Sequence, residues 1–240
     1  MCLNVFQKGF HYAQDGPGNR LVVHLQGCNM HCPWCSNPEG MAWSGGNTIC
    51  IEDLIAEAVL AKPMFFDCGG VTFTGGEATV QFDGLQKALI GLKKESIHTA
   101  IETNGTHPRF PELLEQLDYL IMDFKHPDCG IHKAVTGVGN EQIRTNLRQA
   151  AASSVPLLVR VPMIEGFNAD DLALEGFLEF FSTIQGEHVS FELLKYHEYG
   201  KDKWKACGKV YTMENAFVEE TKRRRWEDCM MQAGLRMIRT

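Results

Sequence analysis

The sequence predicts an α/β fold in which short buried strands alternate with helices. Three observations favour this class: six short runs rich in Val, Ile, Leu or Phe recur along the chain, stretches with helical spacing separate them, and polar residues follow nearly every run. Strands buried on both faces read as continuous apolar runs, and strands alternating with helices favour a parallel sheet with right-handed crossovers. Six units are too few for a closed eight-stranded barrel.

The expected strands are Leu21–Gln26, Val71–Thr74, Thr99–Glu102, Tyr119–Asp123, Leu157–Val161 and Val189–Leu194. The helices between them are marked by apolar residues on one face. These residues are Ile51, Leu54, Ile55, Ala58 and Val59 in the first helix, Ile143, Leu147 and Ala150 in the next, and Leu174, Phe177, Leu178 and Phe181 in the last. Asn140 is the expected N-cap of the second helix, and Asn168 or Asp170 that of the third.

Length and composition exclude several classes of protein. The 240 residues show no internal repeat, low-complexity stretch or Pro/Gly/Ser linker, so we expect a single domain over residues 1–240. The net charge of −7 argues against general nucleic-acid binding. The start of the chain has no basic region followed by an apolar stretch, and no run of 18 apolar residues exists, so we expect neither signal peptide nor membrane span. A cytoplasmic protein follows as an expectation.

Three of the nine cysteines, Cys28, Cys32 and Cys35, form a compact CxxxCxxC segment directly after the first strand. Four-iron clusters are normally held by four thiolates, so three would leave one iron open to a small molecule. That open iron is what radical chemistry with S-adenosylmethionine (SAM) needs, and the spacing is typical of radical-SAM proteins. The alternative is a zinc site with His31 as fourth ligand, since structural zinc is closed by four ligands.

The remaining cysteines and one basic run carry weaker signals. The other cysteines show no pair at ligand spacing and are interpreted as small buried hydrophobes or incidental thiols; they are Cys2, Cys50, Cys68, Cys129, Cys207 and Cys229. Lys222–Arg225 follows two glutamates on a predicted helix. We interpret this run as a solvated helix face, with partner docking as the alternative.

Polar residues gather just past the strand ends, where parallel α/β folds place their chemistry. Gly75 and Gly76 allow close approach of the backbone to a ligand, and Glu77 offers an acceptor for the ammonium of SAM; an ordinary turn is the alternative. Asp123 and Lys125 point to the same side of an extended segment and would serve SAM or form a surface ion pair.

Two further polar residues lie on the last two strands. Arg160 in a buried strand requires a partner, either the SAM carboxylate or a protein carboxylate. His197, at the end of the sixth strand, would donate to the SAM ribose, lie near its sulfonium, or be a structural histidine.

With these motifs the chain resembles the glycyl-radical-enzyme activating enzymes of the radical-SAM superfamily nearly end to end. The cysteine spacing marks the superfamily. The matching segments are Asp15–Arg20, Gln26–Cys28, Thr74–Ala78, Glu102–Gly105, Asp123–Lys125, His132–Val138, then Arg160, Pro162 and Gly166, and Glu192–Trp204. The first of these segments and the Tyr-His-Glu…Lys-Trp tail point to this branch.

The resemblance implies a partial (β/α)6 barrel that binds one [4Fe-4S] cluster and SAM. Cys28, Cys32 and Cys35 would be the cluster ligands, and Lys125 and His197 the catalytic residues. The implied SAM contacts are Trp34, Cys35, Ser36, Gly76, Glu77, Asp123, Phe124, Lys125, Arg160 and His197. Glu102 and Thr103 match a place where relatives bind a monovalent cation, although Glu102 stands in place of aspartate and Ser36 in place of histidine.

The segment Ser36–Glu39 is similar to activases that carry an inserted ferredoxin-like domain. Only Cys50 and Cys68 lie between it and the Gly-Gly-Glu turn, too few for extra clusters, so no insertion is expected. The implied reaction is reductive cleavage of SAM, after which a 5′-deoxyadenosyl radical takes hydrogen from a partner glycine.

The implied partners are a glycyl radical enzyme and a flavodoxin or ferredoxin-type electron donor, with no nucleic acid and no membrane, for a chain that we expect to be a monomer. Two alternatives stay open at this point. One is a radical-SAM enzyme acting on a small molecule, and the other is a non-catalytic zinc or redox-sensing module.

Overall fold

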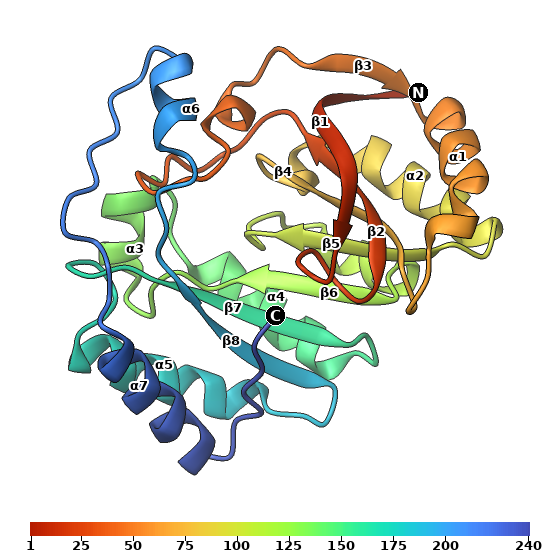
Figure 1. Ribbon diagram of the computed structural model, residues 1–240. Helices are drawn as coiled ribbons and strands as arrows, with labels where there is room; N and C mark the ends of the chain where they lie inside the picture. Colours follow the sequence, from red (N-terminus) through yellow and green to blue (C-terminus); the bar gives the residue numbers. More distant parts are fainter. The chain divides into compact units, whose positions relative to one another are not determined.

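The computed structural model describes all 240 residues, which form eight strands and seven α-helices (Figure 1). The strands are β1 (Cys2–Tyr12), β2 (Asn19–Leu25), β3 (Asn47–Cys50), β4 (Gly70–Gly75), β5 (His98–Thr103), β6 (Tyr119–Asp123), β7 (Leu157–Met163) and β8 (Val189–Lys195). The helices are α1 (Ile51–Leu60), α2 (Phe82–Lys94), α3 (Cys129–Thr136), α4 (Glu141–Ala152), α5 (Asp171–Phe181), α6 (Lys201–Ala206) and α7 (Glu220–Gln232). Short 3-10 helices cover Pro38–Met41, Lys62–Met64, Ala78–Gln81, Phe110–Gln116 and Ser182–Ile184.

The strands are hydrogen-bonded in the order β3-β1-β2-β4-β5-β6-β7-β8. All six strands expected from the apolar runs are present, and β2–β4, β4–β5 and β7–β8 pair in parallel. The order begins at β3 and ends at β8 without closing, so the α/β class with a partial barrel is confirmed.

Two antiparallel strands, β1 and β3, escaped the sequence analysis. β1 pairs with β2 on one side and with β3 on the other. In β1 only Leu3 and Val5 are buried, and no residue of β3 is. Strands that bury so little apolar surface lack the continuous apolar run by which the other six were found.

The chain divides into two compact units. The first comprises residues 1–29, 37–103 and 109–121, and the second comprises residues 30–36, 104–108 and 122–240. The single domain over residues 1–240 without a ferredoxin-like insertion stays a prediction from the sequence.

In the first unit, α1 and α2 lie side by side (Figure 1). A Cβ on Gly91 of α2 would lie 2.3 Å from Cδ1 of Ile55 on α1, so the missing side chain permits this close approach. Lys87 of α2 and Glu52 of α1 form an exposed ion pair at 3.1 Å. The expected first helix is therefore confirmed, with Leu54 and Ala58 fully buried.

The loop Asp15–Arg20 is anchored by its last residue. The Arg20 side chain is fully buried, and its Nε donates to Thr72 Oγ1 at 2.6 Å. Its Nη atoms donate to the carbonyl oxygens of Pro17 (3.0 Å) and Val71 (2.9 Å). Burial lowers the pKa of Arg20 to about 10, which leaves the guanidinium charged at neutral pH.

The second unit has an aromatic core between its strands and α5. Phe124, just after β6, packs on Phe180 with ring centroids 4.8 Å apart, and Phe181 packs on Phe191 of β8 at 4.7 Å. Such pairs contribute about 0.5–1.5 kcal/mol each beyond the area they bury. The Asp170 side chain caps α5 by accepting from Ala173 N–H at 2.8 Å, so of the two expected N-caps Asp170 is confirmed.

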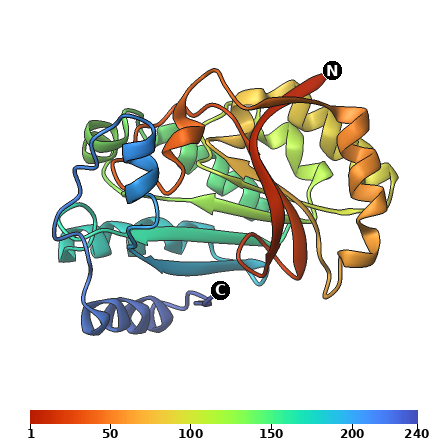
Figure 2. The ribbon, with the colours of Figure 1, turned by 45° about the horizontal axis from the view of Figure 1, so that its top comes forward.

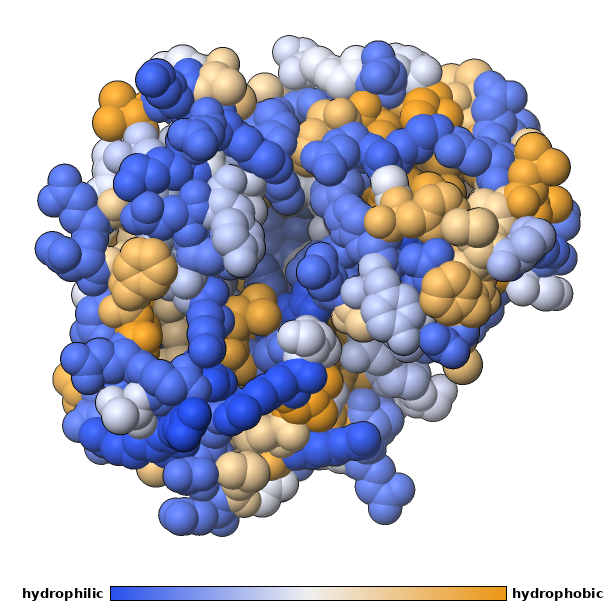
Figure 3. All heavy atoms as spheres, viewed as in Figure 1, coloured by the Kyte–Doolittle hydropathy of each residue, from blue (hydrophilic) through white to orange (hydrophobic).

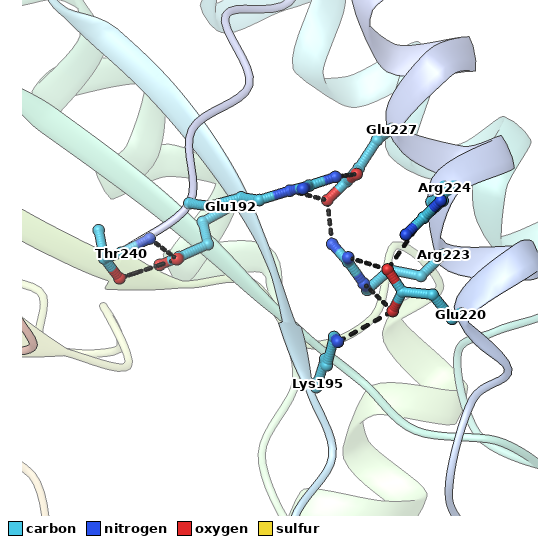
Figure 4. Close-up of polar contacts among 8 residues, drawn as sticks. Glu192, Lys195, Glu220, Arg223, Arg224, Glu227 and Thr240 are labelled. Atoms are coloured by element: carbon cyan, nitrogen blue, oxygen red, sulfur yellow. Dashed lines mark hydrogen bonds and ion pairs between the residues drawn. The ribbon is translucent and has the colours of Figure 1, made fainter.

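Helix α7 lies beside α5 in both ribbon views (Figures 1 and 2), with Trp226 against Phe177. The solvated face expected for Lys222–Arg225 is wrong for Arg223, which is 5% exposed. Arg223 forms ion pairs with both Glu220 and Glu227 (Figure 4). Glu220 also forms ion pairs with Lys195 and Arg224. A charge at a helix position that faces the sheet is retained because it is paired on both sides.

Surface composition agrees with the charge of the sequence. On the face shown in Figure 3 hydrophilic side chains prevail, and apolar ones are scattered among them. None of the helices has the length and apolar character that a membrane span requires.

Helix α3 contains a buried histidine that predicts a pH dependence of stability. His132 is fully buried, and its Nδ1 lies 2.6 Å from the carbonyl oxygen of Val138. Burial, and to a smaller extent the charges of Lys125 and His126, lower its pKa to about 4. Between pH 4 and the ordinary pKa of about 6.5 the unfolded chain binds more protons, so acid destabilises the fold.

We therefore expect His132 to leave the free energy of unfolding at its maximum above about pH 6.5. Toward pH 4 this one group should lower the free energy of unfolding by up to about 3 kcal/mol. Urea titrations at a series of pH values measure it. The His132→Gln variant should show a shallower slope than the wild type over this range. Equal slopes for the two proteins would contradict the assignment.

Candidate functional site

In the first unit, the turn after β4 is hydrogen-bonded to the segment that leads into the cysteines. Gly76 N–H donates to the carbonyl oxygen of Leu25 at 2.9 Å, and Glu77 N–H donates to that of Gly27 at 2.8 Å. Gly27 directly precedes Cys28, which is 9% exposed. The predicted SAM-binding turn and the first predicted cluster ligand thus lie on neighbouring segments of one unit.

Gly76 has a packing reason to be glycine. A Cβ at this position would lie 2.2 Å from the oxygen of Gly27 and 2.3 Å from that of Gly40. Both contacts are with backbone, which cannot move aside as a flexible side chain does. The sequence predicts that this glycine permits the approach of a ligand, and in the structure the packing of the protein itself also requires it.

Glu77 is buried beside two threonines. Its Oε1 accepts from Thr79 N–H at 2.9 Å, from Thr79 Oγ1 at 2.6 Å and from Thr103 Oγ1 at 2.6 Å. Glu102, of the proposed cation site, accepts from Thr74 Oγ1 at 3.0 Å. The structure therefore brings Glu77 and Thr103 together at the ends of β4 and β5, through a direct contact that sequence spacing did not reveal.

In the second unit, Cys32 and Cys35 form a tight turn in which Cys35 N–H donates to Cys32 O at 3.1 Å. Cys32 is 8% exposed and Cys35 is half-buried. Trp34, between them, is buried against Phe167 with ring centroids 4.8 Å apart, and Ser36 follows as a half-buried residue. Packing of the indole fixes the turn that presents the two thiols.

Two residues that hold this turn were missed as site residues. Trp204 of α6 donates its indole Nε1–H to Cys35 O at 2.9 Å. Gly200 packs so closely that a Cβ there would lie 2.4 Å from the same oxygen. Both belong to the segment Glu192–Trp204 that resembles the family. The sequence feature that could have revealed Trp204 is its indole N–H, which needs a hydrogen-bond partner when it is buried.

The segment after β6 pairs Asp123 with Lys125. Lys125 Nζ donates to Asp123 Oδ2 at 2.6 Å, and Lys125 is only 7% exposed, so a purely surface ion pair is excluded. Asn168 Nδ2 donates to Lys125 O at 2.7 Å and fixes the backbone here. The Phe124 side chain lies in the aromatic core, so any contact of Phe124 with a ligand would come from its backbone.

Arg160 has a protein carboxylate as partner. Its Nε donates to Glu192 Oε2 at 2.9 Å, directly across the β7–β8 pair, and both side chains are buried. Thr240 completes the group, because its N–H and Oγ1 donate to Glu192 Oε1 at 2.6 and 2.8 Å (Figure 4). Of the two partners expected from the sequence, the protein carboxylate is therefore present.

His197 follows β8 and stacks on the exposed Tyr199, with ring centroids 4.2 Å apart and planes inclined by 19°. Burial lowers the pKa of His197 below its ordinary value, so the ring is neutral at neutral pH. A neutral imidazole offers one donor and one acceptor, which suits contact with a ribose hydroxyl.

Cys28 belongs to the first unit, and Cys32 and Cys35 to the second. Within neither unit do three or more His, Cys, Asp or Glu side chains gather as ligands of a metal ion, so the three-cysteine site stays a prediction. The chemistry of the donor set fits an iron–sulfur cluster, because all three groups are thiols and two of them are shielded from water. Of the two interpretations given for the remaining cysteines, the buried hydrophobe is wrong for Cys2, Cys50, Cys68 and Cys207, which are exposed, whereas Cys129 and Cys229 are half-buried.

Comparison with known proteins decides the family. The family model of the Radical SAM superfamily matches residues 22–177. The chain belongs to this superfamily. Within it, the pyruvate formate-lyase 1-activating enzyme of Escherichia coli (strain K12) is 36% identical over 205 residues, which cover 83% of each chain. The pyruvate formate-lyase-activating enzyme of Streptococcus mutans is 34% identical over 212 residues, covering 83% of this chain and 80% of its own.

Solved structures agree with this assignment. A domain of the pyruvate-formate lyase-activating enzyme from Bacteroides vulgatus is 28% identical and covers 71% of this chain and 98% of its own, with a TM-score of 0.58. Streptococcus suis SuiB bound to S-adenosylmethionine, 18% identical, shares the fold with a TM-score of 0.66 over 88% of this chain and 47% of its own. The chain is thus a radical SAM enzyme of the pyruvate formate-lyase-activating family, and radical SAM enzymes use a [4Fe-4S] cluster and SAM.

Proposed function

We propose that this protein activates pyruvate formate-lyase by generating a radical on one of its glycines. The observation that carries the proposal is the 36% sequence identity, over 83% of both chains, with the pyruvate formate-lyase 1-activating enzyme of Escherichia coli. When bound, the [4Fe-4S] cluster and SAM supply a one-electron cleavage whose 5′-deoxyadenosyl radical takes hydrogen from the glycine Cα. The chain's own residues bind, orient and shield these groups.

We propose a role for each site residue, and the contacts in the structure support these roles. Cys28, Cys32 and Cys35 are the proposed cluster ligands, and the Cys32–Cys35 turn is held by Trp204. Lys125, whose charge is already paired with Asp123, offers its remaining ammonium protons to SAM, and neutral His197 contacts the ribose.

Five more residues belong to the proposed SAM site. Trp34 and Ser36 would line the adenine, and Gly76 and Glu77 would contact the methionine part. Arg160 acts close by while its charge is balanced by Glu192. Glu102 and Thr103 are the proposed cation ligands.

The chain acts as a monomer in the cytoplasm, and a flavodoxin or ferredoxin-type protein reduces its cluster. Glycine is a chemically sensible target because it has no Cβ to obstruct approach. The partner would present it on a loop that leaves a buried position, and this opening would cost affinity for the complex. Modest affinity and slow turnover suit a reaction that each partner molecule needs once.

The test is electron paramagnetic resonance on reduced protein, SAM and pyruvate formate-lyase under anaerobic conditions. We expect a glycyl doublet that appears with the wild-type partner and is absent when its radical-bearing glycine is replaced by alanine. The alternative is a radical-SAM enzyme whose substrate is a small molecule. Rapid SAM cleavage driven by a small metabolite, with no radical on the partner, would overturn the proposal in favour of that alternative.

A further inference from the structure

Two exposed cysteines of the first unit face each other across strands β1 and β3. Cys2 and Cys50 are directly opposite in the antiparallel register, and their Sγ atoms lie 3.1 Å apart. They are 48 residues apart in sequence, and both are accessible to solvent. Because they lie so far apart along the chain, their spacing gave no signal in the sequence.

The backbone at this pair has the spacing that a disulfide needs. Ile51 N–H donates to Met1 O at 3.0 Å, so the hydrogen bond flanks the Cys2–Cys50 pair instead of joining its two members. Residues opposite each other at such a non-hydrogen-bonded position have Cα atoms about 4.5 Å apart, within the range of about 4.4–6.8 Å that disulfides span. Two thiols on this frame can be joined with little movement of either strand.

We propose that Cys2 and Cys50 form a reversible redox site, a dithiol that small disulfides such as oxidised glutathione convert to an intrachain disulfide. The Cys2 thiolate attacks one sulfur of the small disulfide, which gives a mixed disulfide and releases one small thiolate. Cys50 then loses its proton and attacks Cys2 Sγ, which releases the second small thiolate. The two protein thiols are oxidised, the small disulfide is reduced to two thiols, and the two protons pass to the released thiolates.

The environment of Cys50 supports its assignment as the second thiol to react. The hydrogen bond with Cys2, and then the charge of Cys2, raise the pKa of the Cys50 thiol. We therefore assign the first attack to Cys2 and the second to Cys50, and the geometry of the pair is the same for either order. The thiolate of Cys50 is the resolving group.

Oxidation here would constrain the region of the cluster motif. The disulfide would close a loop that contains Cys28, Cys32 and Cys35, and Cys50 directly precedes α1. Closing such a loop removes conformational freedom from the unfolded chain. The site would thus stabilise the fold under oxidising conditions, without using the cluster cysteines. This inference does not rest on the proposed activity.

The test is an anaerobic titration of the cluster-loaded protein with mixtures of reduced and oxidised glutathione, followed by blocking of free thiols with N-ethylmaleimide. Digestion with trypsin and Glu-C separates Cys2, in a peptide ending at Lys8, from Cys50, in a peptide of residues 40–52 that holds no other cysteine. Mass spectrometry should find these two peptides joined in most molecules at the oxidised end and separate after dithiothreitol. Iron content should not change.

The variant Cys50→Ser should leave Cys2 as a stable mixed disulfide with glutathione. The matched controls Cys68→Ser and Cys207→Ser, at exposed cysteines outside the pair, should form the link as the wild type does. Glutathione retained on both Cys2 and Cys50 of the wild type, or a link that appears only after iron is lost, would overturn the proposal.

Discussion

Replacement of Cys32 by alanine is expected to remove the iron–sulfur cluster and with it all SAM cleavage. A four-iron cluster with only three protein thiolates has no spare ligand, so loss of one leaves two irons without protein attachment. Cys32 lies in the turn where Cys35 N–H donates to its carbonyl, a backbone contact that alanine preserves. The loss should therefore reflect the missing thiolate and not a changed turn.

Iron and sulfide analysis of anaerobically prepared protein measures this effect. About four irons per chain are expected in the wild type and well under one in the variant. Cys207→Ala is the matched control, because Cys207 is exposed in the same unit and should leave iron content unchanged. An intact cluster in the Cys32 variant would exclude Cys32 as a ligand, and about eight irons in the wild type would indicate a second cluster.

Strands could be predicted from the sequence when most of their residues are buried. The strands that run through the interior, such as β4 and β7, were found because nearly every residue in them is buried and Val, Leu or Phe recur along them. β1 escaped because it buries only Leu3 and Val5 over its length. Helix α7 was expected, but Arg223 in it was placed in solvent. The i,i+4 spacing of Arg223 and Glu227 allows the two to pair, but it does not show that the pair is buried.

Contacts in the site could be predicted from the sequence when the two residues are close together along the chain. Asp123 and Lys125 are two residues apart, and their shared side was read from strand geometry. The contact of Trp204 with Cys35 spans 169 residues, and nothing local to either residue specifies it. The same holds for Arg160 and Glu192, whose pairing follows from the β7–β8 register. Chemistry carried by short motifs was predictable, whereas the partners that position it were not.

Replacement of Gly76 by alanine is expected to disturb the cluster loop as well as SAM binding. The new Cβ would lie 2.2 Å from the oxygen of Gly27 and 2.3 Å from that of Gly40, so both segments must move. Overpacking against backbone of this kind costs about 3 kcal/mol. Because Gly27 adjoins Cys28, a shift of this segment displaces a proposed cluster ligand. We therefore expect a lowered unfolding midpoint and reduced iron content along with the loss of SAM affinity.

The matched control is Gly9→Ala in β1 of the same unit, where the nearest atom to a new Cβ is Nε2 of His11 at 4.0 Å. Its stability should stay within about 0.5 kcal/mol of the wild type, since alanine fits there without a clash. Thermal unfolding, iron analysis and SAM binding on the three proteins separate the two roles of Gly76. Full iron content and unchanged stability with SAM affinity lost would mean that this glycine serves the ligand alone. Loss of all three together would mean that the turn after β4 supports the cysteine loop, and that SAM affinity depends on this support.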